Sequence, residues 1–358
     1  MGKYQEKTRL LSDEVSQQLR PGLATVLKSA TGVFLALLSG VLDAFNGIFY
    51  TLIASGGIPP IQVAFLYSIS VLVLSTIPAL LYLQDTVLFK SVKINTLLVG
   101  IGAATAVGSS TEVYAVYHLP LGNEYAVYAG ITPIFCAVGS IIFNGERLKI
   151  SHVLGFLIIT AGTVLIMRPT FIFGDIDTPM NETIVMDSRI DTTGFAYTMT
   201  ICSSFFHSLS CIMWDAISDD VTTFVKIFYM NCISGLICLT LSLVMETQLW
   251  TWSLKEISYV SALALCSASF VCAFHSSLQM EGAVTVNLLT NVQVVVAFIL
   301  QVCITNIQPG KLDIAGTVLV ILGSAVISVC TWWDHVKNQR MNTQSSKAID
   351  YNNEMATP

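Results

Sequence analysis

Polar side chains that could bind a solute or a proton recur at helical spacing inside very apolar segments. Near residues 31–54, Ser39, Asp43, Asn46 and Tyr50 lie three or four residues apart and share one face of a helix. A charged carboxyl facing lipid at mid-span would cost about 2.5–3.5 kcal/mol. We therefore expect Asp43 to face a bundle interior, where it can bind a proton or a cationic group. The alternative is a carboxyl that only links helices by hydrogen bonds.

A second carboxyl, Glu112, lies late in another apolar segment and shares a helix face with Thr105 and Ser109. It could bind a proton or a cationic substrate group, because ionisable residues inside a membrane are usually functional. Its position near the segment end equally allows solvation by water. The next segment carries Glu124, which we expect near the water boundary. It also carries Tyr125 and Tyr128, which could line a cavity or anchor the helix at the membrane surface.

Uncharged amides form a third stripe, Asn287, Asn291 and Gln301, near residues 283–304. Their donors and acceptors suit an uncharged or zwitterionic solute, and suit hydrogen bonds between helices almost equally. The predicted solute-binding residues are Asp43, Asn46, Tyr50, Glu112, Tyr125, Tyr128, Asn287 and Asn291.

Nothing in the sequence indicates an enzyme or a bound metal. The 9 cysteines include no Cys-x-x-Cys, the 5 histidines lack metal-ligand spacing, and no phosphate loop or nucleophile elbow occurs. We therefore predict no catalytic residue, no metal, no cofactor and no nucleic acid partner.

The elements that must position these residues are transmembrane helices. The chain is 54% hydrophobic and only 11% charged, whereas soluble domains are about 25% charged. Each apolar segment has about the 20 residues that a helix needs to cross a bilayer. The predicted spans are 31–54, 60–83, 95–117, 122–143, 150–168, 193–215, 221–245, 257–279, 283–304 and 312–333.

The second half of the chain repeats the first at an offset of about 161 residues. Gly155 and Gly162 in one half correspond to Gly316 and Gly323 in the other. Because each repeat has five crossings, the second must enter the membrane from the opposite side. The fold class is therefore an all-α polytopic membrane protein with two inverted five-helix repeats, which is typical of transporters.

Positive charges predict the orientation. With ten crossings both termini lie on one side, and only Arg168, Arg189, Lys255 and Lys311 of the 17 Lys and Arg residues fall on the other. This bias places the termini in the cytosol. The predicted organisation is a cytosolic segment 1–30, a first repeat 31–168, an extracytosolic loop 169–192, a second repeat 193–333 and a cytosolic tail 334–358.

Several motifs resemble the EamA-type drug/metabolite transporters. They are Pro133, Gly145-Glu146-Arg147-Leu148, and Gly155 with Gly162; Leu278-Gln279-Met280-Glu281-Gly282-Ala283 resembles the animal G branch of solute carrier family thirty-five. The second repeat departs from the pattern, because Ile307-Gln308 stands where Glu146-Arg147 would be expected. The resemblance implies ten helices, a central cavity between the halves, and peripheral fifth and tenth spans where a homodimer contact would form.

Two functions follow as hypotheses. The first is a secondary-active transporter of a small organic solute by alternating access, proton-linked through Asp43 or Glu112. The alternative is a membrane scaffold that retains the transporter fold and acts through a partner protein. The predicted partners are a small-molecule solute and the lipid bilayer, in either the plasma membrane or an endomembrane. Lys226 is the only Lys or Arg inside a span, which disfavours nucleotide sugars because their phosphates call for Arg or Lys. Small metabolites and amines remain open, and so do organic anions if the dipoles of broken helix ends bind them.

Overall fold

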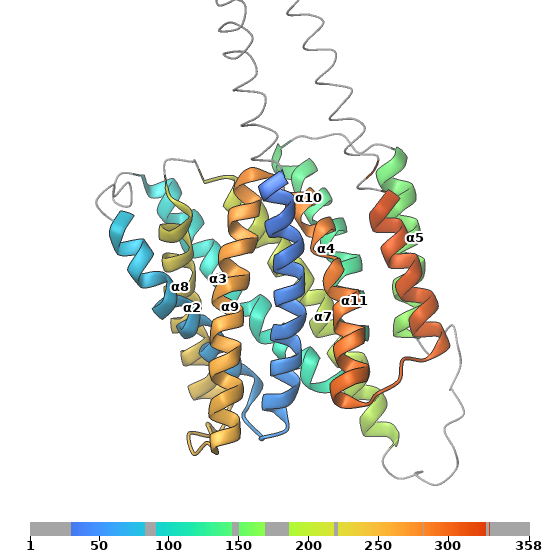
Figure 1. Ribbon diagram of the computed structural model, residues 1–358. Helices are drawn as coiled ribbons and strands as arrows, with labels where there is room; N and C mark the ends of the chain where they lie inside the picture. The colour runs from blue at the N-terminus through green and yellow to red at the C-terminus, as the bar shows by residue number, and fades with distance from the viewer. Residues whose placement is uncertain are drawn as a thin grey trace, which may run out of the picture.

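The computed structural model describes residues 30–82, 91–144, 150–168, 186–217, 221–281, 283–326 and 329. Within these ranges all regular structure is helical, and the helices run side by side in one bundle (Figure 1). Glu146-Arg147, most of the 169–192 connection and the two terminal segments lie outside the described residues.

The described helices follow the predicted spans closely. In chain order they are the first helix Ala30–Ala54, α2 Pro60–Tyr82, α3 Val92–His118, α4 Leu121–Asn144, α5 Ile150–Met167, α7 Met186–Asp215, α8 Thr223–Met245, α9 Leu254–Met280, α10 Ala283–Leu289, α11 Val292–Leu300 with a π-helical turn Gln301–Thr305, and a last helix over 311–326.

Apolar surface on the outside of the bundle marks it as a membrane protein. Phe34, Ile77, Leu236 and Leu243 each expose more than 60% of their surface. In the described part of the chain, 6 helices are long and apolar enough to cross a bilayer. The prediction of an all-α, multi-pass integral membrane protein is therefore confirmed.

Local sequence accounts for where several helices begin and end. α3 ends at His118 because Leu119 precedes Pro120, and a residue before proline is disfavoured in the helical conformation. α9 begins with a capping box, in which the Ser253 hydroxyl accepts from the Glu256 backbone N–H and the Glu256 carboxylate accepts from that of Ser253.

One predicted span is not a continuous helix. The segment expected over 283–304 breaks between α10 and α11, where Thr290 and Asn291 form a turn. The first helix packs closely against this turn, because a Cβ at Gly40 would lie 2.5 Å from the Thr290 carbonyl oxygen. The two helices together cover the predicted ninth span, and neither a glycine nor a proline lies at the turn between them.

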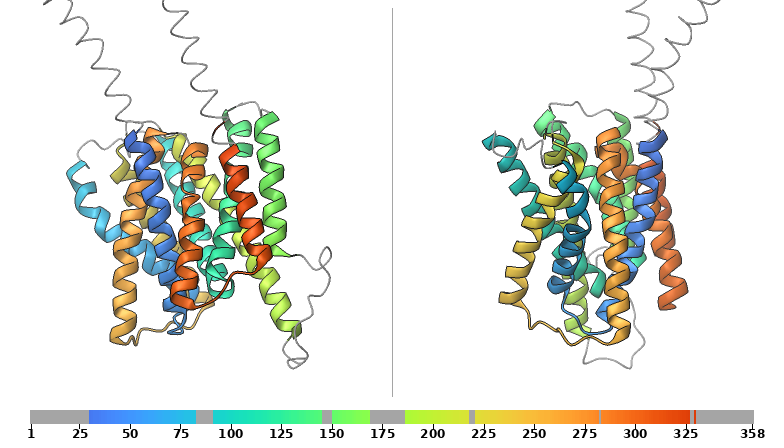
Figure 2. Two further views of the ribbon diagram at one scale, coloured as in Figure 1. Left: turned by 45° about the vertical axis from the view of Figure 1, so that its right-hand side comes forward. Right: turned by 60° about the vertical axis from the view of Figure 1, so that its left-hand side comes forward.

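Helices from the two halves of the chain alternate in the bundle. α3 packs against α7 and α8, and α2 packs against α8 and α9. α5 and the last helix lie together at one edge, as the views of Figures 1 and 2 agree. This arrangement leaves side chains of both halves facing each other in the centre.

Candidate functional site

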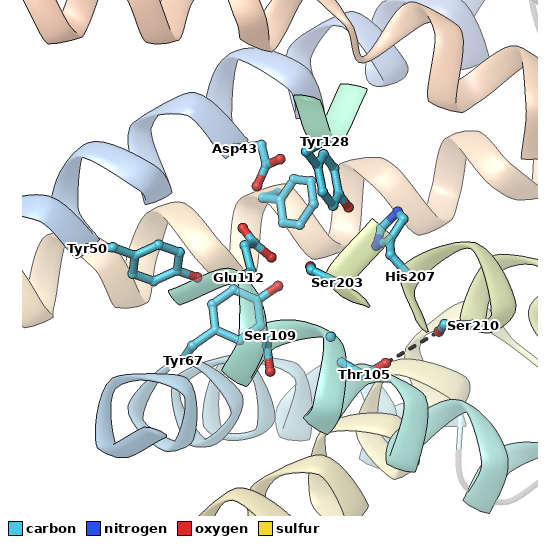
Figure 3. A pocket seen from close by; sticks show the side chains of 12 residues that line it. Asp43, Tyr50, Tyr67, Thr105, Ser109, Glu112, Tyr128, Ser203, His207 and Ser210 are labelled. Carbon is cyan, nitrogen blue, oxygen red and sulfur yellow. Dashed lines mark hydrogen bonds between the residues drawn. The ribbon is translucent and has the colours of Figure 1, made fainter. Parts of the chain in front are cut away.

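A cavity lies in the centre of the bundle and receives side chains from both halves of the chain (Figure 3). Its volume, counted as the space that the centre of a water molecule can occupy, is about 50 Å³. One water needs about 10–15 Å³ on this measure, so a few waters or a small solute fit. The lining residues are Asp43, Tyr50, Tyr67, Thr105, Gly108, Ser109, Glu112, Tyr128, Ser203, His207, Ser210 and Phe270.

Two carboxyl groups dominate the charge of the cavity. Asp43 projects from the first helix with 7% of its surface exposed, and Glu112 projects from α3. Figure 3 shows the two carboxyls turned toward the same space. No Arg or Lys is among the described residues that line the cavity, so it carries acidic groups without a fixed cation.

Hydroxyl groups and a histidine from α7 form the opposite wall. Ser203 is 1% exposed, and its Oγ has no hydrogen-bond partner in the described structure although it lines the cavity. Ser210 Oγ lies 3.3 Å from Thr105 Oγ1, which links α7 to α3. The His207 ring meets the Tyr128 ring edge-on, with 5.6 Å between centroids.

The predicted solute-binding residues divide into two groups. Asp43, Tyr50, Glu112 and Tyr128 line the cavity together, and their role in binding a solute stays a prediction. The others do not line it: Asn46, Tyr125, Asn287 and Asn291.

Asn46 and Tyr125 support Asp43 from behind. Asn46 is 1% exposed and lies beside the Asp43 carboxyl. The Tyr125 hydroxyl donates to the Asp43 backbone carbonyl at 2.7 Å, and a Cβ at Gly47 would meet the Tyr125 ring at 2.6 Å. Tyr125 therefore fixes the first helix against α4 and is not an interfacial anchor.

The side-chain amides of Asn287 and Asn291 form hydrogen bonds with residues outside the cavity. Asn287 Nδ2 donates to the Ala283 carbonyl at 2.8 Å, and Asn291 Nδ2 donates to Ser324 Oγ of the last helix at 2.7 Å. Neither amide lines the cavity in this structure, and their role in binding a solute stays a prediction.

Sequence reasoning missed several residues of the site. Ser203, His207 and Ser210 on α7 are spaced by four and three residues, a signal for one shared helix face. Glu124, expected near the water boundary, is 1% exposed, and its Oε1 has no hydrogen-bond partner in the described structure. Packing around the start of α4 buries Glu124, and the spacing of residues along the sequence does not predict that burial.

The buried cation Lys226 lies elsewhere. Its Nζ is 5.3 Å from the centroid of the Trp214 ring and 3.4 Å from the Ile217 carbonyl oxygen. Lys226 is 1% exposed but does not line the cavity, so it supplies no positive charge for a phosphate there.

Comparison with known proteins assigns the family. The model of the EamA-like transporter family matches twice, over residues 30–168 and 194–329. The chain is 24% identical over 314 residues to "Solute carrier family 35 member G1" from Homo sapiens, covering 86% of this chain and 81% of that protein. One solved crystal structure superposes with a TM-score of 0.55 at 17% identity, covering 86% of this chain and 97% of the other, which shows a shared fold. The resemblance found in the motifs is confirmed: the chain belongs to the EamA-like transporter family.

Proposed function

We propose that this protein is a secondary-active transporter that moves a small organic solute across a membrane by alternating access. The observation that carries the proposal is the central cavity, which is lined by the first helix, α2, α3 and α4 from the first half of the chain and by α7 and α9 from the second. A site between two halves can open to either face when one half rocks against the other.

Ten spans arranged as two inverted repeats, 31–168 and 193–333, form part of this proposal. Support comes from the contact between α5 and the last helix. A Cβ at Gly162 would lie 2.5 Å from the Gly316 carbonyl oxygen, and a Cβ at Gly323 would lie 2.9 Å from that of Gly155. Exchanging each glycine for its equivalent in the other repeat turns the first contact into the second. A two-fold axis between the repeats requires this self-complementarity.

We further propose that Asp43 and Glu112 couple solute movement to protons. Both carboxyls face one cavity, and no Lys or Arg from the described residues lines it. A buried carboxylate without a cation is costly, so each is stabilised either by a proton or by a positive charge on the solute. Alternation between the two states would link solute flux to the proton gradient.

Reconstitution into liposomes tests the carrier. Purified protein in liposomes with an imposed pH gradient should accumulate one member of a metabolite panel, and the accumulation should collapse when a protonophore removes the gradient. A scaffold that only retains the fold would show no uptake above protein-free liposomes for any member of the panel. Such a result would favour the alternative hypothesis of a regulatory membrane protein.

Orientation has its own test. With both termini cytosolic, a tag at either end should resist external protease in intact cells and be cleaved after selective permeabilisation of the plasma membrane. A tag inserted in the 169–192 connection should show the opposite accessibility relative to the membrane that holds the protein. Termini on opposite sides would contradict an even number of crossings and, with it, the paired five-helix repeats.

A further inference from the structure

The chemistry of the cavity wall specifies the charge of its occupant. Asp43 and Glu112 both face the space, and the described lining residues include no Lys or Arg. A neutral solute would leave both carboxyls to be neutralised by protons alone, and an anion would add a third negative group. An organic cation compensates the carboxyls directly at short range, where the low dielectric strengthens the attraction.

Aromatic rings on several walls of the cavity also favour a cation as its occupant. Tyr50 from the first helix, Tyr67 from α2, Tyr128 from α4 and Phe270 from α9 all line the cavity. Aromatic faces attract cations within about 6 Å, more strongly when water is excluded. Rings from four helices surround the space, so a cation meets aromatic surface on more than one side.

Ser203 adds an independent sign of a missing ligand. Its Oγ is buried, has no hydrogen-bond partner in the described structure, and lines the same cavity. Figure 3 shows it between Glu112 and His207. A buried hydroxyl without a partner is destabilising, because it has lost its hydrogen bonds to water and gained none in the protein. An occupant with N–H donors would supply the partner that the protein lacks.

We infer that the cavity binds a small organic amine in its protonated form, held by the carboxylates of Asp43 and Glu112 and by the Ser203 hydroxyl. This inference rests on the proposed transport function and names its substrate class. The N–H groups donate to the three acceptors, and the carbon part contacts the tyrosines and Phe270. The cavity volume of about 50 Å³ restricts the occupant in this conformation to a few non-hydrogen atoms.

Protons and the amine compete for the same carboxyls. The other ionisable groups around the pair, contributed by the first helix, α2, α4, α7 and α9, are Tyr50, Tyr67, Tyr125, Tyr128, Glu124, His207 and Cys266. None of them is a Lys or an Arg, so none replaces the amine as the counter-charge. Amine affinity therefore falls as the pH is lowered and the carboxyls take up protons. This competition is what an exchanger of amine for protons requires.

A series of small probes that differ in charge, with four or five non-hydrogen atoms each, tests the inference on the purified full-length protein. The probes are propylamine, 1-propanol, propionate and tetramethylammonium, with binding followed by saturation-transfer NMR. Propylamine should bind, and 1-propanol should bind at least about tenfold more weakly, since it lacks the charge. Propionate binding as tightly as propylamine would overturn the inference. Equal binding of tetramethylammonium, which has no N–H group, would overturn the role of the three acceptors.

Variants locate the binding. Asp43→Asn and Glu112→Gln should each lower propylamine affinity at least about tenfold. Glu256→Gln is the matched control, because it removes a carboxylate outside the cavity while a glutamine still completes the capping box of α9. Wild-type affinity in both cavity variants would overturn the site. If one variant misfolds, the other variant and the probe series on the wild-type protein still decide.

The outcomes separate this inference from the transport proposal. If propylamine binds at the carboxyls but liposomes show no uptake of any solute, the site stands and the carrier fails. If liposomes accumulate a neutral or anionic solute and propylamine does not bind, the carrier stands and the amine assignment fails.

Discussion

α4 and the α10–α11 segment correspond in sequence at the repeat offset of about 161 residues but differ in shape and in what they contribute to the cavity. α4 continues as one helix through Pro133 and places Tyr128 in the cavity. Near the proline, the Ser208 hydroxyl of α7 donates to the Thr132 carbonyl, and the Thr132 hydroxyl donates to the Tyr128 carbonyl. These hydroxyl bonds connect α4 to α7 and support the turn of α4 just before the proline.

The segment that lacks proline and glycine is the one that breaks. Residues 288–292 contain neither, yet α10 ends at Leu289 and α11 begins at Val292. Gly40 of the first helix lies against the turn, and Asn291 ties it to Ser324. Helix continuity in these two segments therefore depends on the neighbouring helices more than on helix propensity.

The largest expected effect comes from removing the close approach at the break. In Gly40→Ala, the new Cβ would overlap the Thr290 backbone carbonyl, which cannot rotate away. We expect a loss of about 2–4 kcal/mol or failure to fold, measured as a lower melting temperature in detergent. Gly194→Ala is the control, since nothing lies within 4 Å of its added Cβ, and it should be neutral or slightly stabilising. Equal melting temperatures for the two variants would show that the first helix does not shape the break.

The next largest effect is expected at Asp43, the cavity carboxyl of the first helix. Asp43 corresponds at the repeat offset to Ser204, whose hydroxyl donates to the Thr200 carbonyl within α7. Asp43→Asn should flatten the pH dependence of uptake in liposomes, because an amide cannot take up and release the coupling proton. Ser204→Ala should keep the original pH profile. An unchanged profile in Asp43→Asn, with normal expression, would retire Asp43 and leave Glu112 as the candidate for coupling.

A smaller effect is expected at the contact between α5 and the last helix, where glycines of the two halves correspond in sequence. If α5 and the last helix are related by a two-fold axis, Gly162→Ala and Gly323→Ala change equivalent contacts, each against a backbone carbonyl of the facing helix. Each should lower stability by about 1–3 kcal/mol, and the two by similar amounts. Gly235→Ala, whose Cβ would meet only Ser68 Cβ at 3.7 Å, serves as the control. A strong effect at only one of the two glycines would argue against equivalence.

The smallest effects are expected from one side chain of the α10–α11 segment and one of α4, which should differ in whether they change stability or affinity. Asn291→Ala removes the hydrogen bond to Ser324 and should cost about 0.6–2 kcal/mol without changing solute affinity. Tyr128→Leu on α4 removes the aromatic ring from the cavity and should do the reverse, lowering affinity more than it lowers the melting temperature. Affinity loss in Asn291→Ala with unchanged stability would return the amide to the binding site.

The positions of the helices could be predicted because a bilayer imposes a minimum length and an apolar composition on anything that spans it. Helix periodicity also indicated which face of the first helix carries Asp43 and Tyr50. It did not indicate that Asn287 and Asn291 would lie outside the lining of this cavity, because their segment is not one regular helix. It failed for Glu124 as well, because distance along the chain from a helix end does not measure burial when neighbouring helices cover that end.

The sequence by itself determined the membrane class, the approximate spans, the internal repeat and the scarcity of cations within the spans. These properties depend on composition and spacing, which the chain carries before it folds. Only the tertiary structure decided that Asp43 and Glu112 share a cavity with Ser203, His207 and Phe270, and that the Asn291 amide faces Ser324. Those relations join residues from distant helices, and they depend on which helix backbones approach closely enough to turn a side chain inward or aside.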